Sequence, residues 1–318
     1  MSVAAAGRID VHAHYFGGAV ADLIAGRGPG GPDRDRWTAD TALDVMAEFD
    51  ITAQILSLPF TPMATPDDPG FATRFARQVN EDYAELIATH PGRFGAFAVL
   101  PGTGADDMLD EIGYALDTLH LDGIALNSNI GGHYLGSEFM EPVLAELNRR
   151  RTPVFIHPTD CAHAAELALG RPRSVIEFPF DTARNIVNAL YTGVFHRHPN
   201  LVLILPHCGG PLPSLSWRIS EHTTVAIGPD DTPITPQHVA DMLARLYYDT
   251  AMAGAPVSLL PTLQITDISH VLFGTDWPAA PEPTVARTID QLVHAGLTAD
   301  ELHAIEYGNT AKLLSRFG

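Results

Sequence analysis

The sequence predicts a (β/α)8 barrel, and three observations support this fold class. Eight short segments rich in Val, Ile, Leu and Phe are spaced along 318 residues, and helix-like segments alternate with them. The apolar segments have no polar face, which is typical of parallel strands covered by helices. A doubly wound open sheet is the alternative, but eight regular repeats favour the closed barrel. We therefore expect residues 1–318 to form a single barrel domain.

The expected strands and helices follow from two different periods of hydrophobicity. Strands are expected at residues 9–14, 52–58, 93–100, 122–128, 153–158, 201–207, 245–250 and 270–276. Helices are expected between them, at residues 41–50, 74–90, 105–120, 138–150 and 182–198. In these helical segments apolar residues recur every three or four positions, which indicates one face packed against a sheet.

Two insertions interrupt the repeat, after the first and the fifth predicted strands. They span residues 17–40 and 161–181. Active sites of (β/α)8 barrels lie at the carboxyl ends of the strands, where these insertions begin. We expect them to cover or line a pocket, although the glycine-rich run of the first is equally typical of surface decoration.

Composition excludes several classes of partner. The formal net charge is -19 and the only lysine is Lys312, which argues against binding to nucleic acid or to anionic membranes. Two cysteines, Cys161 and Cys208, cannot make a disulfide framework. The first residues lack the pattern of a signal peptide, and no apolar run reaches the roughly 20 residues of a membrane span. We expect a cytoplasmic protein that binds a small molecule.

Four of the fifteen histidines fall at the carboxyl ends of predicted strands. His12 and His14 end the first strand, His157 the fifth and His207 the sixth, and Asp276 ends the eighth. A lone histidine is more often a core or surface residue. Four histidines and one aspartate at strand ends meet at one mouth if the barrel closes. Together they favour a site for Zn²⁺, Mn²⁺ or Fe²⁺ with a position left for water or substrate.

Several motifs also resemble a known family. The segments IDVHAHYF, VFIHPTD, LPHCGG and FGTDWP occur in this order over nearly the whole chain and resemble the amidohydrolase superfamily. Within it they are similar to the amidohydrolase-2 branch, which contains aminocarboxymuconate-semialdehyde decarboxylase and the decarboxylases of hydroxybenzoic acids. The stretches HPGRFGAFAVLP and EFPFDTARN look most like the 6-methylsalicylate decarboxylase-like members.

The resemblance implies a role for each of the five residues. His12, His14, His157 and Asp276 match the ligands of one divalent metal ion, with Zn²⁺ expected first and Mn²⁺ as the alternative. His207 matches the histidine that does acid and base work beside the metal. Loss of CO₂ from an aromatic ring requires protonation of the ring carbon, so an acid is needed. We expect Asp276 to give this proton with His207 as its partner.

Two differences from related members of the superfamily concern the number of metal ions and the support of the catalytic histidine. Binuclear members of the superfamily bridge two metals with a carboxylated lysine near the end of strand four, where this chain offers Asn127 instead. A single metal ion is the consequence. The decarboxylases of γ-resorcylate support the catalytic histidine with a glutamate three residues later, and here that position is Gly210.

Other residues are candidates for binding the substrate or for shaping its pocket. Arg218 matches the arginine that the semialdehyde decarboxylase supplies across a dimer interface, which implies a homodimer or a higher oligomer; a surface salt bridge is an equally good explanation. Asp249, near the mouth, is expected to be structural, and Cys208 to be a packed residue. The remaining candidates are Arg34 and Arg36 for a carboxylate, Asn127, and the aromatic residues Phe178, Phe180 and Trp277.

Three functions remain open from the sequence. The first is a metal-dependent, non-oxidative decarboxylase of a small aromatic acid, hydroxybenzoate-like or 6-methylsalicylate-like, or of an enol carboxylic acid. The second is a hydrolase or hydratase of a lactone, amide or unsaturated diacid, in which His207 deprotonates a metal-bound water. The third is a barrel that only binds a small molecule, which the five intact site residues disfavour. Arginines near the metal favour the first function, and an uncharged pocket favours the second.

Overall fold

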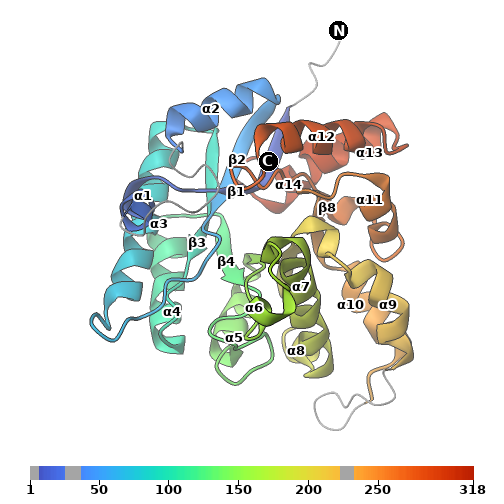
Figure 1. The fold of residues 1–318 in the computed structure, drawn as a ribbon, viewed down its shortest axis with the longest axis horizontal. Helices are drawn as coiled ribbons and strands as arrows, with labels where there is room; N and C mark the ends of the chain where they lie inside the picture. Colours follow the sequence, from blue (N-terminus) through green and yellow to red (C-terminus); the bar gives the residue numbers. More distant parts are fainter. Residues whose placement is uncertain (1–6, 26–36, 223–232) are drawn as a thin grey trace.

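The predicted barrel is confirmed: eight parallel strands pair in chain order from β1 to β8 (Figure 1). The computed structural model describes residues 7–25, 37–222 and 233–318. The strands are β1 (Arg8–His14), β2 (Ile51–Ser57), β3 (Phe94–Val99), β4 (Gly123–Asn127), β5 (Pro153–His157), β6 (Val202–Leu205), β7 (Tyr247–Asp249) and β8 (Val271–Leu272).

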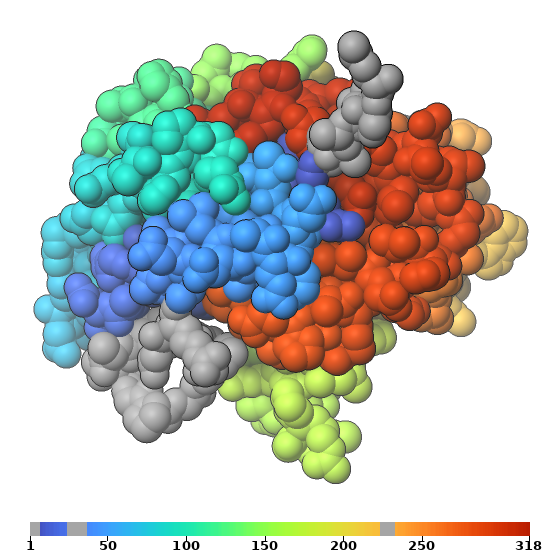
Figure 2. All heavy atoms as spheres, turned by 90° about the horizontal axis from the view of Figure 1, so that it is seen from above, coloured from blue at the N-terminus to red at the C-terminus, as the bar shows by residue number. Residues whose placement is uncertain are grey.

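The first and last parts of the chain close the barrel. The backbone N–H of Val11 donates to Phe273 O (2.9 Å), and that of His14 donates to Trp277 O (2.8 Å). Viewed from above, the blue elements of the N-terminal part lie beside the orange and red elements of the C-terminal part (Figure 2). The carboxyl ends of β1 and β8 therefore meet at the same mouth as those of the other strands.

The helices surround the strands, as the alternating pattern predicts. They are α1 (Gly18–Ala25), α2 (Ala39–Glu48), α3 (Phe71–Thr89), α4 (Ala105–Gly113), α5 (Glu141–Arg150), α6 (Ala164–Leu167), α7 (Arg173–Tyr191), α8 (Val194–Arg197), α9 (Leu212–Glu221), α10 (Pro236–Ala244), α11 (Pro256–Thr262), α12 (Glu282–Val293), α13 (Ala299–His303) and α14 (Asn309–Leu313). None of the described helices is both long and apolar enough to cross a membrane.

Two apolar cores hold this arrangement together. Inside the barrel, Val11, Ile55, Phe97, Phe155 and Ile204 pack against one another and are fully buried. A larger core fills the layer between the strands and the surrounding helices. Because residues on both faces of the strands are buried, the strands form a rigid base for the side chains at their carboxyl ends. That residues 1–318 make one domain stays a prediction.

The predicted ends of strands six and eight are wrong. β6 stops at Leu205 and β8 at Leu272, so His207 and Asp276 lie in the turns that follow. Beyond β8 the backbone no longer forms regular strand pairing, because its N–H groups donate elsewhere. Thr275 N donates to Asp10 Oδ1 (3.0 Å), and Asp276 N donates to His12 O (2.7 Å).

The second insertion is more helical than expected. A helix was predicted to start at residue 182, whereas α7 starts at Arg173 and runs through Pro179. Proline has no N–H to donate to the carbonyl four residues earlier, which here belongs to Val175. Val175 is exposed, so water can donate to this carbonyl instead. The helix predicted at residues 105–120 also changes character, because α4 ends at Gly113 and a π-helical turn follows at Tyr114–Thr118.

Candidate metal centre and its cavity

Four side chains predicted as metal ligands come together at the barrel mouth. His12 and His14 lie on the same face of β1, His157 ends β5, and Asp276 follows β8. One ligand atom from each lies within 4.8 Å of every other. His12 and His14 are fully buried, and His157 and Asp276 are 6% and 8% exposed. The alternation of a strand and the closure of the barrel bring these donors to one point.

Partners around the imidazoles fix their orientation. His12 Nδ1 lies 2.8 Å from Asp249 Oδ2, so this nitrogen carries the proton and Nε2 turns to the centre. His14 Nδ1 lies 3.3 Å from Ser57 Oγ, and its Nε2 lies 3.0 Å from Asp276 Oδ1. Each β1 histidine thus presents Nε2 to the group, held by Asp249 at the end of β7 or by Ser57 at the end of β2.

Burial and charge act in opposite directions on the cluster. Burial lowers the pKa of His157 well below its ordinary value, and the neighbouring His14 and His12 add to this. Burial lowers the pKa of His12 as well, but Asp249 and Asp276 outweigh it and raise that pKa to about 10. Burial favours a neutral Asp276, yet the surrounding imidazoles hold its pKa well below the ordinary value.

The donor set suits a divalent metal ion. Nε2 of His12 and Nδ1 of His157 are buried and find no hydrogen-bond partner among the described residues. His12 Nε2 lies 3.4 Å from Asp276 Oδ1, and buried imidazole nitrogens without a hydrogen bond beside a carboxylate suit the binding of a cation. Three imidazoles and one carboxylate are typical ligands of Zn²⁺ and are also used by Mn²⁺.

His207 lies next to this cluster, as predicted. Its Nε2 is 3.6 Å from Asp276 Oδ2, and its ring centre is 5.1 Å from that of His12. The backbone N–H of His207 donates to Asp249 Oδ1 (2.9 Å), so Asp249 holds both a predicted ligand and the predicted acid-base residue. Cys208 is buried and its pKa is raised to about 12 by burial, which agrees with a packed residue rather than a nucleophile.

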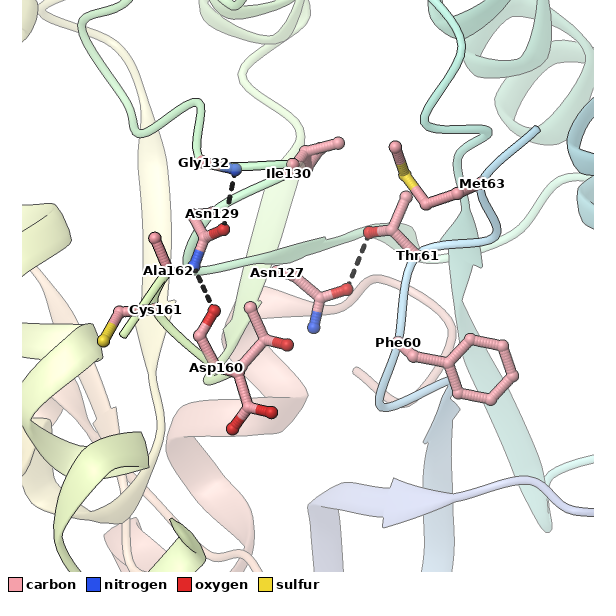
Figure 3. Close-up of a pocket in the computed structure, with 12 residues that line it drawn as sticks. Phe60, Thr61, Met63, Asn127, Asn129, Ile130, Gly132, Asp160, Cys161 and Ala162 are labelled. Carbon is pink, nitrogen blue, oxygen red and sulfur yellow. Dashed lines mark hydrogen bonds between the residues drawn. The ribbon is translucent and has the colours of Figure 1, made fainter. Parts of the chain in front are cut away.

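A cavity of about 390 Å³ lies at the same mouth of the barrel, and its lining includes neither the four predicted ligands nor His207. It is lined by Phe60, Thr61, Met63, Asn127, Asn129, Ile130, Gly131, Gly132, Thr159, Asp160, Cys161 and Ala162 (Figure 3). Asn127 ends β4, and the other lining residues follow β2, β4 and β5. The cavity adjoins the centre because Asn127 pairs with His157 in the sheet and its Nδ2 donates to His157 O (3.4 Å).

The predicted substrate-binding residues lie in different parts of the structure. Of these, Asn127 lines the cavity. Phe178 and Phe180 lie on α7, where Phe180 is 47% exposed, and Trp277 is buried with its Nε1 donating to Glu282. Arg218 is exposed on α9, and none of these four lines the cavity. Arg34 and Arg36 lie outside the described residues.

Sequence reasoning missed most of the cavity wall. Thr61 Oγ1 donates to Asn127 Oδ1 (2.6 Å), and Asn129 Nδ2 donates to the backbone O of Asp160 (3.1 Å), as Figure 3 shows. The segment LPFTPM directly follows β2, and LNSNIGG and HPTDCA begin in the last residues of β4 and β5 and continue beyond them. Polar residues just after strand ends were the available signal for these positions.

Comparison with known proteins agrees with the geometry. The family model described as Amidohydrolase matches residues 9–316. A 6-methylsalicylic acid decarboxylase of Penicillium expansum is 30% identical over 97% of this chain and 96% of its own length. The 6-methylsalicylic acid decarboxylase acuB of Aspergillus aculeatus is 33% identical over 88% of this chain and 87% of its own length.

A solved structure supports the same relationship. The crystal structure of a protein described as amidohydrolase II superposes with a TM-score of 0.86 at 28% identity. The match covers 97% of this chain and 99% of the other. The barrel architecture is therefore shared with a solved structure over nearly the whole chain.

Proposed function

We propose that this chain, which belongs to the amidohydrolase family, is a metal-dependent, non-oxidative decarboxylase of a small aromatic carboxylic acid. The observation that carries the proposal is the convergence of three histidines and Asp276 beside His207 and an adjoining cavity. Hydroxybenzoates are the favoured substrates, with 6-methylsalicylate first among them, because relatives that span nearly the whole chain are named for that acid.

His12, His14, His157 and Asp276 are proposed to hold one divalent metal ion, with Zn²⁺ as the first choice and Mn²⁺ as the second. When bound, the ion supplies positive charge that orients the substrate carboxylate and stabilises phenolate character. Metal analysis of protein purified without added metal distinguishes the two ions. Because the donor set accepts both, activity after reconstitution with each ion is the second readout.

The His207–Asp276 pair is proposed to deliver the proton. Protonation of the ring carbon forms a C–H bond, and the bond to the carboxyl carbon then breaks and releases CO₂. We assign the proton to Asp276, with His207 as its partner. The Nε2 to Oδ2 distance of 3.6 Å leaves a short path for it within the pair.

The cavity is proposed to hold the aromatic ring. Its volume lies within the range of small-molecule sites, and Phe60, Met63 and Ile130 give it apolar walls. Arg218 stays a proposed carboxylate ligand, contributed across a homodimer interface. Its exposure on α9 is consistent with such a role, and the mass of the protein in solution together with Arg218→Ala kinetics tests it.

One observation favours a second candidate function. Among the described residues no arginine or lysine lines the cavity, which is the pattern expected for a hydrolase or hydratase acting through a metal-activated water. In that alternative His207 takes the proton from the water. The decarboxylase remains the better proposal because the relatives matched over nearly the full chain are named decarboxylases.

The deciding experiment measures CO₂ release from a panel of acids by metal-replete protein. The panel contains 6-methylsalicylate, 2,6-dihydroxybenzoate and benzoate, and a parallel panel contains lactones and unsaturated diacids. The proposal predicts CO₂ from an ortho-hydroxylated acid and none from benzoate, which lacks the hydroxyl. Turnover of a lactone or a diacid without CO₂ release from any acid supports the hydrolase or hydratase instead.

A further inference from the structure

The apolar wall of the cavity contains one side chain that a ligand can reach and displace. Met63 lines the cavity and is 44% exposed, whereas Ile130, which also lines it, is only 3% exposed. Figure 3 shows Met63 on the same side of the cavity as Phe60 and Thr61. Methionine is unbranched and flexible, so the position of its side chain depends on the surface against which it packs.

The surface against which Met63 packs is a glycine. A Cβ atom at Gly102 would overlap Met63 Sδ, and it would lie 3.0 Å from Thr61 Cγ2 and 3.2 Å from Ile130 Cγ2. Three side chains that line the cavity therefore converge on this one backbone position. Gly102 is buried and does not adopt a positive φ, so the glycine provides space here rather than an unusual backbone conformation.

Of these three side chains, Met63 is the one that can move. Thr61 Oγ1 donates to Asn127 Oδ1 (2.6 Å), which fixes the threonine. Ile130 exchanges two backbone hydrogen bonds of 3.0 Å with His133 and is almost fully buried. A group added at the glycine would therefore displace the thioether of Met63 before it displaced the other two side chains.

This corner of the cavity is connected to the metal centre. Thr61 is bound to Asn127, whose Nδ2 donates to the backbone O of the predicted ligand His157 (3.4 Å). In the proposed function the substrate ring lies in this cavity. One edge of the ring then faces the uncharged corner formed by Thr61, Met63 and Ile130.

We propose that Met63 is a specificity-determining residue, which limits the size of the apolar substituent that the substrate ring can carry. Gly102 is the positioning residue that holds the Met63 thioether back from the ring. The inference rests on the proposed function, in which the ring occupies this cavity. A methyl group can pack against the seated thioether, whereas a larger alkyl group requires the thioether to leave its place. The preferred substrate is thus a hydroxybenzoate with a substituent no larger than methyl on the edge that faces Met63.

The first test compares 2-hydroxybenzoates that carry hydrogen, a methyl group or an isopropyl group at position 6. Wild-type protein is expected to prefer the methyl over the isopropyl compound about 10-fold or more in kcat/KM, because the larger group overlaps Met63. Met63→Ala is expected to bring this ratio within about 3-fold. The control is Val293→Ala, which truncates an apolar side chain of similar exposure (43%) at the end of α12 and is expected to keep the wild-type ratio.

The second test addresses the place of the thioether. Gly102→Ala is expected to lower kcat/KM for the methyl compound about 5-fold relative to the unsubstituted one, because the displaced thioether takes the space of the methyl group. In the Met63→Ala background the same change is expected to alter this ratio less than about 2-fold. The control is Gly113→Ala at the end of α4, where a Cβ atom would meet nothing within 4 Å. An undiminished effect of Gly102→Ala in the Met63→Ala background overturns the role of Gly102.

Binding of phenols separates failure of this inference from failure of the proposed function. Titration of metal-loaded wild-type protein with 3-methylphenol and with 3-isopropylphenol requires no turnover and no folded variant. Binding of the methyl compound about 10-fold more tightly, with loss of this difference in Met63→Ala, supports the role of Met63 even if no acid releases CO₂. Equal binding or no binding of the two phenols overturns the inference. So does an unchanged methyl to isopropyl ratio in Met63→Ala while wild-type protein decarboxylates hydroxybenzoates.

Discussion

The metal centre and the adjoining cavity are built in different ways. The centre takes His12, His14 and His157 from the ends of β1 and β5, where the strands are buried on both faces. The cavity takes its residues from the loops that follow β2, β4 and β5, and Thr159 and Asp160 are only partly buried. The rigid sheet therefore fixes the chemistry, and the loops fix which molecule reaches it.

This difference has a measurable consequence. Changes in the metal centre are expected to reduce activity on every substrate by a similar factor. Changes in the cavity wall are expected to alter the ratio between substrates while the bound metal stays in place. Four substitutions probe this contrast, from the largest expected effect to the smallest.

The largest effect is expected from His12→Ala. The substitution removes one metal ligand and leaves the anionic Asp249 buried without its imidazole partner. Activity is expected to fall about 10³-fold or more on all substrates, and metal content is expected to fall with it. Metal analysis and kcat/KM check this, with His294→Ala, an exposed histidine at the end of α12, as the matched control. Full metal occupancy in His12→Ala would remove His12 from the centre.

A smaller effect is expected from Asp249→Asn. Asp249 accepts from His12 Nδ1, His207 N and Ala251 N, so the amide disturbs both a ligand and the loop that carries the acid-base residue. Metal affinity or activity is expected to fall about 10- to 100-fold, as for other partners of metal-bound histidines. Competition with a chelator measures the affinity. Wild-type affinity combined with wild-type kcat would contradict this role.

Asp181→Asn is expected to affect the cavity and spare the centre. The buried carboxylate accepts from Ser128, Asn129 and Tyr134, and an amide turns one acceptor into a donor that faces other donors. The free energy of unfolding is expected to fall by about 1–3 kcal/mol, and KM to rise with metal content unchanged. Urea unfolding and metal analysis check both. Loss of the metal in this variant would show that the two regions are not independent.

The smallest effect is expected from Thr61→Val. The hydroxyl of Thr61 donates to Asn127 Oδ1 (2.6 Å), and valine has the same shape without this donor. The loss of about 1 kcal/mol corresponds to about fivefold in KM, with kcat and metal content close to those of the wild type. Steady-state kinetics on two hydroxybenzoates measures it. A fall in kcat without a change in KM would instead connect Thr61 to the reaction itself.

The barrel and the ligand cluster could be predicted because both depend on local patterns. Alternation along β1 places His12 and His14 on one face, and parallel strands bring His157 to the same mouth. The exact backbone at His207 and Asp276 could not be predicted. Both residues adopt positive φ in turns, a conformation set by hydrogen bonds to Asp249 and His12 that are distant in sequence.

The cavity wall could not be predicted for a similar reason. Its shape depends on Asp181, whose partners Ser128 and Asn129 lie some fifty residues earlier in the chain. The start of α7 was missed because Pro179 is normally read as a helix boundary, and only its exposed surroundings make it acceptable. Local propensity carries no information on such tertiary contacts.

The central claim is that the centre protonates a ring carbon as CO₂ leaves, and one measurement tests it most directly. Metal-replete protein is incubated with 6-methylsalicylate in D₂O, and the product is analysed by mass spectrometry and NMR. The account predicts one deuterium at the carbon that carried the carboxyl group, and loss of this product in His207→Ala and Asp276→Asn. A metal-replete sample that releases no CO₂ and forms no deuterated phenol from any hydroxybenzoate would contradict it.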